Sequence, residues 1–265
     1  MHIFRKLFRR LNRFCEKKIE SIYRQSKVRF IYRTEFGVST YVHPEKLIDI
    51  IRSNTSCDAA QWMNALQDVL PPMEVVIDIG ANIGIVSCWL SRKSHIVYSF
   101  EPEQLNINFL QKNIQLNDIK NIEIVPFAVG AYDGATDFFI RDSFGHHGIK
   151  SKHITKVVDI RQVPMVRLDS FCREKLIDRI SFLKIDVEGG ELDVLQGFDE
   201  YLVSKKVDMV LFEHAPVLFN TDEEKAAVFD YLTSRDYLIF DIDHKKLDRS
   251  TMLRIQQGDF YAKPV

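Results

Sequence analysis

The sequence predicts an α/β fold with a doubly wound, mostly parallel sheet. From residue 73 onward, short apolar segments alternate with amphipathic helical segments, which is typical of right-handed β–α–β units. The first apolar segment, VVIDI, runs into a glycine-rich turn that opens a helix. Turns of this kind bind nucleotides in many α/β proteins and simply reverse the chain in many others, so the rest of the sequence must decide between these roles.

The strands and helices follow one another in a regular order. The expected strands are 75–79, 95–101, 121–129, 180–187 and 206–213, followed by the strand-like YLIFDID and GDFYAKP. Helices are expected in IGIVSCWLSRK, in EQLNINFLQKNIQLN, from 190 to about 203 and around DEEKAAVFDYLTSR. Between 133 and 170 the alternation stops, and two antiparallel excursions flank the loop SFGHHGIKS. We expect residues 73–265 to form one domain.

Composition narrows the class of protein. The chain has 265 residues, of which 46% are hydrophobic and 28% charged, so it can bury one large core. Its four cysteines are scattered without a CxxC pair, which indicates neither a disulfide framework nor a zinc site and fits a reducing compartment. No apolar run approaches the ~20 residues of a membrane span, and the N-terminus lacks the apolar core of a signal peptide. We therefore expect a cytoplasmic protein.

The N-terminal segment is basic and amphipathic. Residues 1–33 hold eleven lysines and arginines but only two acids, with apolar residues at helical spacing. Such a helix binds an anionic membrane surface peripherally, packs on the protein itself, or acts as a targeting segment, and all three interpretations stay open. Residues 34–72 form a predicted helical lead-in that ends at the Pro71-Pro72 pair.

The glycine turn indicates which ligand is bound. Asp78, Gly80, Asn82 and Gly84 follow the first strand, with asparagine at the middle position where the NAD-binding pattern GxGxxG has glycine. A carboxylate is unfavourable beside a pyrophosphate but favourable beside a cation. S-adenosylmethionine carries a sulfonium and an amino group without any phosphate, so the turn favours this cofactor. Glu101 ends the second strand, where a carboxylate can bind both ribose hydroxyls of an adenosine.

A second acidic signature lies in FLKIDVEGGELDVLQG, residues 182–197. A buried strand ends in Asp186, Glu188 follows, and a glycine pair turns into a helix. Glu191 in the first turn of that helix is interpreted as a charge favoured by the helix dipole. Asp186 and Glu188 have no comparable structural role, and the strand end that carries them faces the ligand crevice.

These motifs together resemble the FkbM-type S-adenosylmethionine-dependent methyltransferases. The matching segments are VIDIGANIG, SFEPE, KNIQLN, VPFAVGAYDG, VRLDSF, LKIDVEGGE and VLFEHAP, and they cover about 70–216 in the order found in that family. The resemblance implies a seven-stranded class I methyltransferase fold, here with a helical N-terminal extension. It also implies methylation of hydroxyl groups on sugars or secondary metabolites. The chain departs from many relatives in the GHHG loop at 145–148 and over residues 1–70.

The resemblance places the cofactor on particular residues. Gly80, Ala81, Asn82 and Gly84 would surround its methionine part, with Asp78 at the strand end. Glu101 would bind the ribose hydroxyls, with Pro102 beside it. The remaining positions are Phe127 and Ala128 near the adenine and Asp186 near the reacting methyl group.

Methyl transfer to a hydroxyl needs alignment first and a general base second. Asp186 is the first candidate for the base, assisted by Glu213 or His214. The acceptor side is expected to involve the histidines of the loop, His146 and His147, together with Glu188. Asp186 and Glu213 would also suit Mg²⁺, but nothing in their spacing requires a metal, and none is expected.

The sequence thus predicts an S-adenosylmethionine-dependent O-methyltransferase acting on a sugar, glycan or lipid-linked saccharide. Its location would be cytoplasmic, and peripheral membrane contact through residues 1–30 is one of the three interpretations that stay open for the basic segment. A small secondary metabolite is the alternative acceptor, and an NAD-dependent oxidoreductase or a catalytically silent nucleoside-binding scaffold are alternatives of another class. Nucleic acid is not expected as a partner, because the acidic remainder of the chain would repel phosphates.

Overall fold

The computed structural model describes residues 31–41, 60–67, 70, 72–142, 146–150 and 155–265. It divides the chain into two compact units, Met1–Ala60 and Gln61–Val265. Residues 1–30 of the predicted basic helix and residues 42–59 of the predicted helical lead-in lie outside the described residues. The described part of the first unit is an antiparallel hairpin of β1 (Ile31–Arg33) and β2 (Ser39–Tyr41), a strand pair that was not predicted from the sequence.

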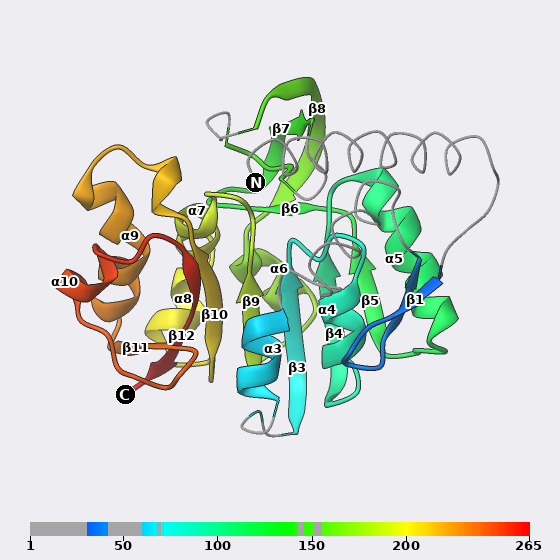
Figure 1. Cartoon of the computed structure of the whole chain (residues 1–265), viewed down its shortest axis with the longest axis horizontal. Helices are drawn as coiled ribbons and strands as arrows, with labels where there is room; N and C mark the ends of the chain where they lie inside the picture. The colour runs from blue at the N-terminus through cyan, green and yellow to red at the C-terminus, as the bar shows by residue number, and fades with distance from the viewer. Residues whose placement is uncertain (1–30, 42–59, 68–69, 71, 143–145, 151–154) are drawn as a thin grey trace, which may run out of the picture. The chain divides into compact units, whose positions relative to one another are not determined.

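The second unit contains a seven-stranded sheet, as predicted (Figure 1). Its order is β11-β12-β10-β9-β3-β4-β5, and all neighbours are parallel except that β12 runs antiparallel to β10 and β11. The bounds are β3 (Met73–Ile79), β4 (Ser94–Phe100), β5 (Ile122–Val125), β9 (Phe182–Ile185), β10 (Val210–His214), β11 (Tyr237–Asp241) and β12 (Gly258–Pro264). The order reverses at β3 and β9, so the ligand crevice of such a sheet is expected at their carboxyl ends.

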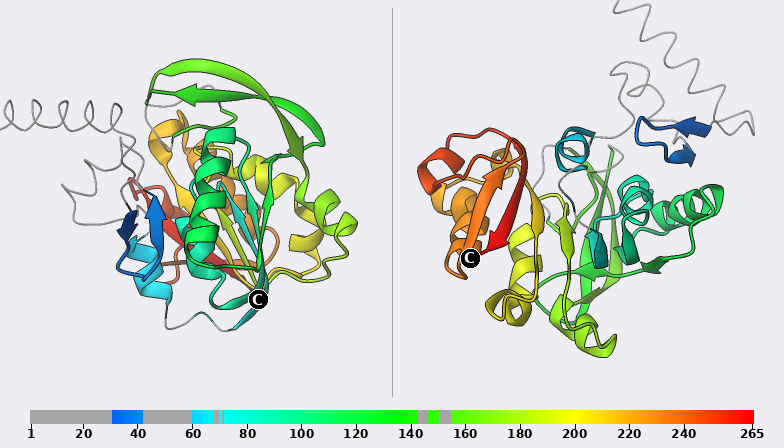
Figure 2. Two further views of the ribbon diagram at one scale, coloured as in Figure 1. Left: turned by 90° about the vertical axis from the view of Figure 1, so that its right-hand side faces the viewer. Right: turned by 90° about the horizontal axis from the view of Figure 1, so that it is seen from below.

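Helices cover both faces of this sheet (Figure 2). They are α3 (Ala60–Leu66), α4 (Ile85–Leu90), α5 (Gln104–Leu116), α6 (Leu168–Glu174), α7 (Glu191–Gln196), α8 (Asp199–Val203), α9 (Asp222–Thr233) and α10 (Arg249–Met252), with a 3₁₀ turn at Pro216–Leu218. The start of α9 shows how local sequence sets these bounds, because Thr221 and Glu224 form a capping box there. No helix in the described ranges combines the length and the apolar character needed to cross a bilayer.

Alternate residues of the central strands face two different layers. Ile77, Ile79, Leu183 and Ile185 belong to one large apolar core on the face covered by α6 to α9. The residues between them face the other layer, where Trp62 of α3 packs edge-on against Trp89 of α4, with ring centroids 5.7 Å apart. Polar side chains at these alternate positions of the strands therefore point toward α3 and α4.

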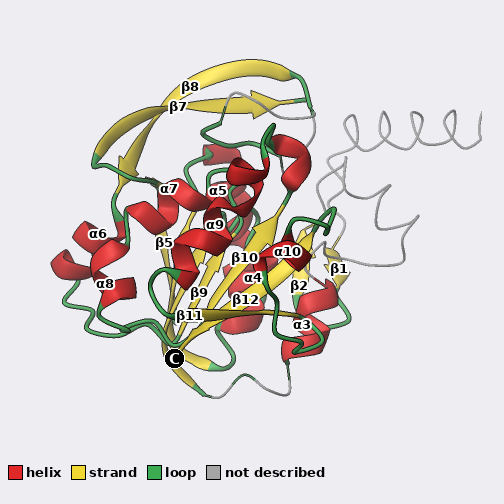
Figure 3. Ribbon diagram, turned by 90° about the vertical axis from the view of Figure 1, so that its left-hand side faces the viewer, coloured by secondary structure: helices red, strands yellow, loops and turns green. Residues whose placement is uncertain are grey.

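The antiparallel excursion predicted between 133 and 170 is present as a separate small sheet. β6 (Ala128–Val129), β7 (Gly134–Arg141) and β8 (Val157–Val166) pair in the order β6-β8-β7. The β7–β8 hairpin extends beyond the carboxyl ends of the parallel strands (Figures 1 and 3). A Cβ atom added at Gly148, which pairs with β7, would lie 3.0 Å from the carbonyl oxygen of Val187, so this part of the hairpin loop lies over the end of β9.

Candidate active site

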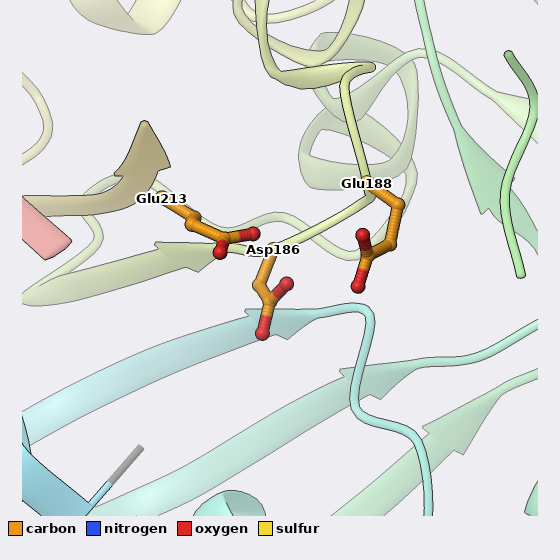
Figure 4. A group of neighbouring side chains, drawn as sticks. All are labelled: Asp186, Glu188 and Glu213. Atoms are coloured by element: carbon orange, nitrogen blue, oxygen red, sulfur yellow. The ribbon is translucent and has the colours of Figure 1, made fainter. Parts of the chain in front are cut away.

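Three carboxylates meet at the carboxyl ends of β9 and β10. Asp186 follows β9 directly, Glu188 lies in the turn after it, and Glu213 is the penultimate residue of β10. One carboxylate oxygen from each residue lies within 4.8 Å of the others, and all three side chains are half-buried (Figure 4). The structure therefore brings together three of the residues predicted for the site. Oxygen atoms in this arrangement suit a cation, including a hard divalent ion, or several hydroxyl donors.

Local backbone geometry aims Glu188 into this group. Glu188 and Gly189 both have left-handed backbone conformations, with φ of 58° and 96°. The buried Glu191 carboxylate fixes the turn by accepting hydrogen bonds of 3.2 Å from the Val187 and Gly189 N–H groups. Burial raises the pKa of Glu191 to about 7, although these hydrogen bonds oppose the shift. Glu191 is thus more than the helix-terminal charge predicted from the sequence, because it holds the turn that carries Glu188.

The carboxylates repel one another. Burial, followed by the charges of Asp186, Glu213 and Glu191, raises the pKa of Glu188 to about 9, and Arg141 offsets this only in part. A cationic ligand placed here would relieve the repulsion.

Asp259 is a fourth acid that the sequence analysis missed. It lies on β12 directly opposite Glu213, so the two side chains point to the same side of the sheet. Burial and the charges of Asp186 and Glu213 raise the pKa of Asp259 to about 7. The strand GDFYAKP was predicted, but only its antiparallel register places its acid in the site.

Asp78 does not face an open site. Its side chain is fully buried on the α4 side of the sheet, where Oδ2 accepts a hydrogen bond of 2.6 Å from Ser87 and Oδ1 lies 3.2 Å from the Lys184 ammonium. The sequence analysis expected a ligand's cation beside this carboxylate. In the structure the cation beside Asp78 is Lys184 of the neighbouring strand β9.

The glycines of the turn are required by the protein's own packing. Gly80 and Gly84 have φ of 75° and 83°, where side chains are disfavoured. A Cβ at Gly80 would fall 1.8 Å from the Asp186 carbonyl oxygen, and one at Gly84 would fall 2.0 Å from a methyl group of Leu110. The glycine pattern alone is therefore no independent evidence for a ligand.

Glu101 organises the same turn from the end of β4. Its Oε2 accepts a hydrogen bond of 2.9 Å from the Asn82 N–H, and its Oε1 accepts one of 2.8 Å from the Glu103 N–H. Burial raises the pKa of Glu101 to about 7, although these bonds and one from the Asn106 side chain lower it. A carboxylate has about four acceptor positions, and these donors occupy three of them.

The other predicted cofactor residues lie near these strand ends. Pro102 follows Glu101 and is half-buried, whereas Ala128 is buried in a small apolar cluster with Phe138, Val163 and Met165. Ala81 is buried as well, and its N–H donates a hydrogen bond of 3.0 Å to the Phe100 carbonyl. Phe127 packs in part against the main core.

Arg141 binds the loop that carries the two histidines. Its side chain is buried and donates to the carbonyl oxygens of Phe139, His146 and Lys150, while its backbone N–H donates to His147 Nδ1 at 3.1 Å. Burial lowers the pKa of His147, which favours the neutral imidazole. These bonds hold residues 146–150 above the turn at Glu188.

His214 lies apart from the carboxylates. Neighbouring residues of a strand alternate between faces, so His214 points away from the side that carries Glu213. Its buried ring packs edge-on against Phe260, with centroids 6.0 Å apart. Burial lowers its pKa to about 4, although a hydrogen bond with the Met252 backbone opposes the shift. The predicted assistance of His214 in catalysis is therefore not supported by its position.

The sheet order and the acidic strand ends define a class I methyltransferase-like α/β protein. The family model described as "Methyltransferase FkbM domain" matches residues 78–239. Since this match spans more than half of the chain, the chain belongs to the FkbM methyltransferase family. Membership in this family argues against the NAD-dependent oxidoreductase that the sequence left open.

Individual relatives are distant. "Methyltransferase 1" of Beauveria bassiana is 27% identical over 150 residues, covering 49% of this chain and 60% of that protein. "Hexuronic acid methyltransferase AglP" of Haloferax volcanii is 28% identical over 145 residues, covering 54% of this chain and 57% of that protein. A solved structure titled as methyltransferase FkbM from Methylobacillus flagellatus aligns over 83% of this chain and 54% of its own, with 18% identity and a TM-score of 0.49. The match to these curated relatives thus spans about three fifths of their length.

Proposed function

We propose that the protein transfers a methyl group from S-adenosylmethionine to a hydroxyl of a saccharide acceptor. The observation that carries the proposal is the position of the Glu101 carboxylate. It is buried at the end of β4, is bound to the backbone of the glycine turn and keeps one acceptor position for a ribose hydroxyl. Family membership supports methyl transfer, and the relative named as a hexuronic acid methyltransferase favours a sugar as acceptor.

The residues present fit this cofactor. Its sulfonium and amino group are cationic, and they would lie beside Asp186 and Glu213 and would favour ionisation of Glu188, whose pKa the neighbouring acids raise. The backbone of Gly80 to Asn82 would hold the methionine part. Pro102, Phe127 and Ala128 are the residues proposed beside the adenine.

The chemistry follows from the placement of the acids. The bound cofactor supplies an electrophilic methyl group. Asp186 would accept the proton of the attacking hydroxyl, which contributes typically 10²–10⁴-fold to a rate. Glu213 is held by a hydrogen bond of 2.9 Å from the Gln257 side chain and, with Glu188, would bind other hydroxyls of the acceptor. His146 and His147 would contact the acceptor from the loop.

The direct test is calorimetric titration of the whole protein with S-adenosylhomocysteine, with NAD as a parallel control. Micromolar binding of S-adenosylhomocysteine alone would support the proposal. A screen of neutral sugars, amino sugars and uronic acids with radiolabelled S-adenosylmethionine would then identify the acceptor. Binding of NAD, or of neither compound, would overturn the assignment of the cofactor.

A further inference from the structure

A buried lysine lies beneath the proposed active site. Lys184 is on β9, two residues before Asp186, and only 5% of its side chain is exposed. Its ammonium nitrogen lies 3.2 Å from Asp78 Oδ1, 3.2 Å from Asp186 Oδ2 and 3.0 Å from the Gly80 carbonyl oxygen. The ammonium also donates a longer hydrogen bond of 3.5 Å to the Ile79 carbonyl oxygen, so two backbone carbonyls and two carboxylates surround it. The position of the ammonium is therefore fixed by partners on β3, on the cofactor turn and on the strand end after β9.

These contacts join the two loops that form the site. The Asp186 N–H donates a hydrogen bond of 3.2 Å to the Ile79 carbonyl oxygen, and the glycine at position 80 leaves room for the Asp186 carbonyl. The backbones of the cofactor turn and of the strand end after β9 are thus in direct contact. Lys184 adds a side-chain bridge between the same two loops, from the Gly80 carbonyl to the Asp186 carboxylate.

A buried polar network holds the lysine from the other side. Ser99 of β4 donates a hydrogen bond of 2.8 Å to Ser87 of α4, and Ser87 donates one of 2.6 Å to Asp78. Asp78 then pairs with Lys184. The network connects four elements and ends at Asp186, the one half-buried member at the edge of the site. Burying four polar side chains costs free energy unless every member is paired, so the network specifies one arrangement.

We propose that Lys184 is a positioning residue that fixes the Asp186 carboxylate relative to the cofactor turn. The inference rests on the proposed function, in which Asp186 accepts the proton. Asp186 belongs to a group of mutually repelling carboxylates, and without a fixed counter-charge its side chain would turn away from Glu188 and Glu213. Lys184 holds one Asp186 oxygen and leaves the other to face the acceptor.

The test separates positioning from mere charge balance. Lys184→Met alone leaves Asp78 buried without its cation, so we expect a large loss of thermal stability. Adding Asp78→Asn removes the stranded charge and should restore most of the melting temperature. In this double variant we expect faster amide hydrogen exchange at residues 79–84 and 186–190, with the other strands of the sheet unchanged. We also expect kcat to fall at least 100-fold with little change in KM, and the acidic limb of the pH profile to move to higher pH.

Two controls keep the outcome decisive. If the double variant fails to fold, Asp186→Asn should still accelerate exchange at residues 79–84, whereas Glu213→Gln, which changes a carboxylate of the same group, should not. Wild-type hydrogen exchange at both loops in the folded double variant would overturn the proposal, and so would a wild-type kcat in that variant. If the double variant does not fold, wild-type exchange in Asp186→Asn would overturn it. Because hydrogen exchange needs no turnover, a wild-type protein that does not bind S-adenosylhomocysteine would refute the proposed function separately.

Discussion

Replacing Glu101 with glutamine tests the proposed cofactor site most directly. Glutamine keeps the size of the side chain but replaces one acceptor oxygen by an NH₂ group. That group would face either the Asn82 or the Glu103 N–H, which now donate to the two carboxylate oxygens at 2.9 and 2.8 Å. Either the Asn82 N–H of the cofactor turn or the Glu103 N–H at the start of α5 would then lose its hydrogen-bond acceptor. The ribose hydroxyl also loses a charged acceptor.

The magnitude follows from the loss of charge-assisted hydrogen bonds. Such bonds contribute about 1.5–3 kcal/mol when buried, so affinity for S-adenosylhomocysteine should fall roughly 10- to 100-fold. Glu103→Gln is the matched control. It changes another buried acid, two residues away, whose carboxylate caps α5 by accepting from the Asn106 N–H and pairs with Arg161. We expect its affinity to stay within about threefold of wild type.

The pH dependence gives a second, independent readout of the same site. In the folded protein burial raises the pKa of Glu101 to about 7, so the carboxyl carries a proton at lower pH. A ribose hydroxyl that donates to it favours the ionised form, and affinity is then fully present above about pH 7 and lost as pH falls. If binding restores the ordinary pKa of 4.5, affinity should rise about 20-fold between pH 5.5 and 7.5. In Glu101→Gln this component should disappear. Wild-type affinity together with an unchanged pH slope in the variant would refute the placement of the ribose.

Four further predictions address the rest of the chain. Asp186→Asn should lower kcat by about 10²–10⁴-fold while S-adenosylhomocysteine still binds in calorimetry, and full activity would exclude Asp186 as the base. Gly84→Ala should lower the melting temperature, since its Cβ would fall 2.0 Å from a methyl group of α5; an unchanged temperature would contradict the packing. Glu101 and Glu191 bind protons in the folded state at pH values where the unfolded chain does not, so stability should fall as pH rises from about 4.5 to 7, and a flat thermal profile would contradict their burial. Deleting residues 1–30 should release the protein from anionic vesicles while cofactor binding persists, and unchanged sedimentation with vesicles would exclude the N-terminus as the anchor.

Much of the fold could be predicted because its signals are local. Alternating apolar segments gave the parallel strands, and the break at 133 predicted the excursion that forms β7 and β8. The juxtaposition of Asp186 and Glu213 also followed, because the ends of parallel strands meet at one edge of a sheet. The side of the sheet that His214 faces could not be predicted. Successive residues of a strand face opposite sides, and the sequence alone does not show which side faces the site.

Contacts between residues on neighbouring strands could not be predicted from the sequence. The sequence predicts a cation beside Asp78, and the structure places Lys184 there. Its cation, Lys184, lies 106 residues away, and only the parallel register that pairs the two residues on β3 and β9 brings them together. Asp259 became visible in the same way, through the antiparallel register of β12 opposite Glu213.

Together these pairings change what the site is expected to bind. Asp186, Glu188, Glu213 and Asp259 gather at the carboxyl edge, while Lys184 is shared with Asp78 and Arg141 donates to carbonyl oxygens of the hairpin loop. Neither cation is therefore free to neutralise an anionic acceptor. A saccharide that presents hydroxyl or amino groups to the carboxylates matches this charge distribution, whereas a uronic acid would need a divalent cation between its carboxylate and these acids.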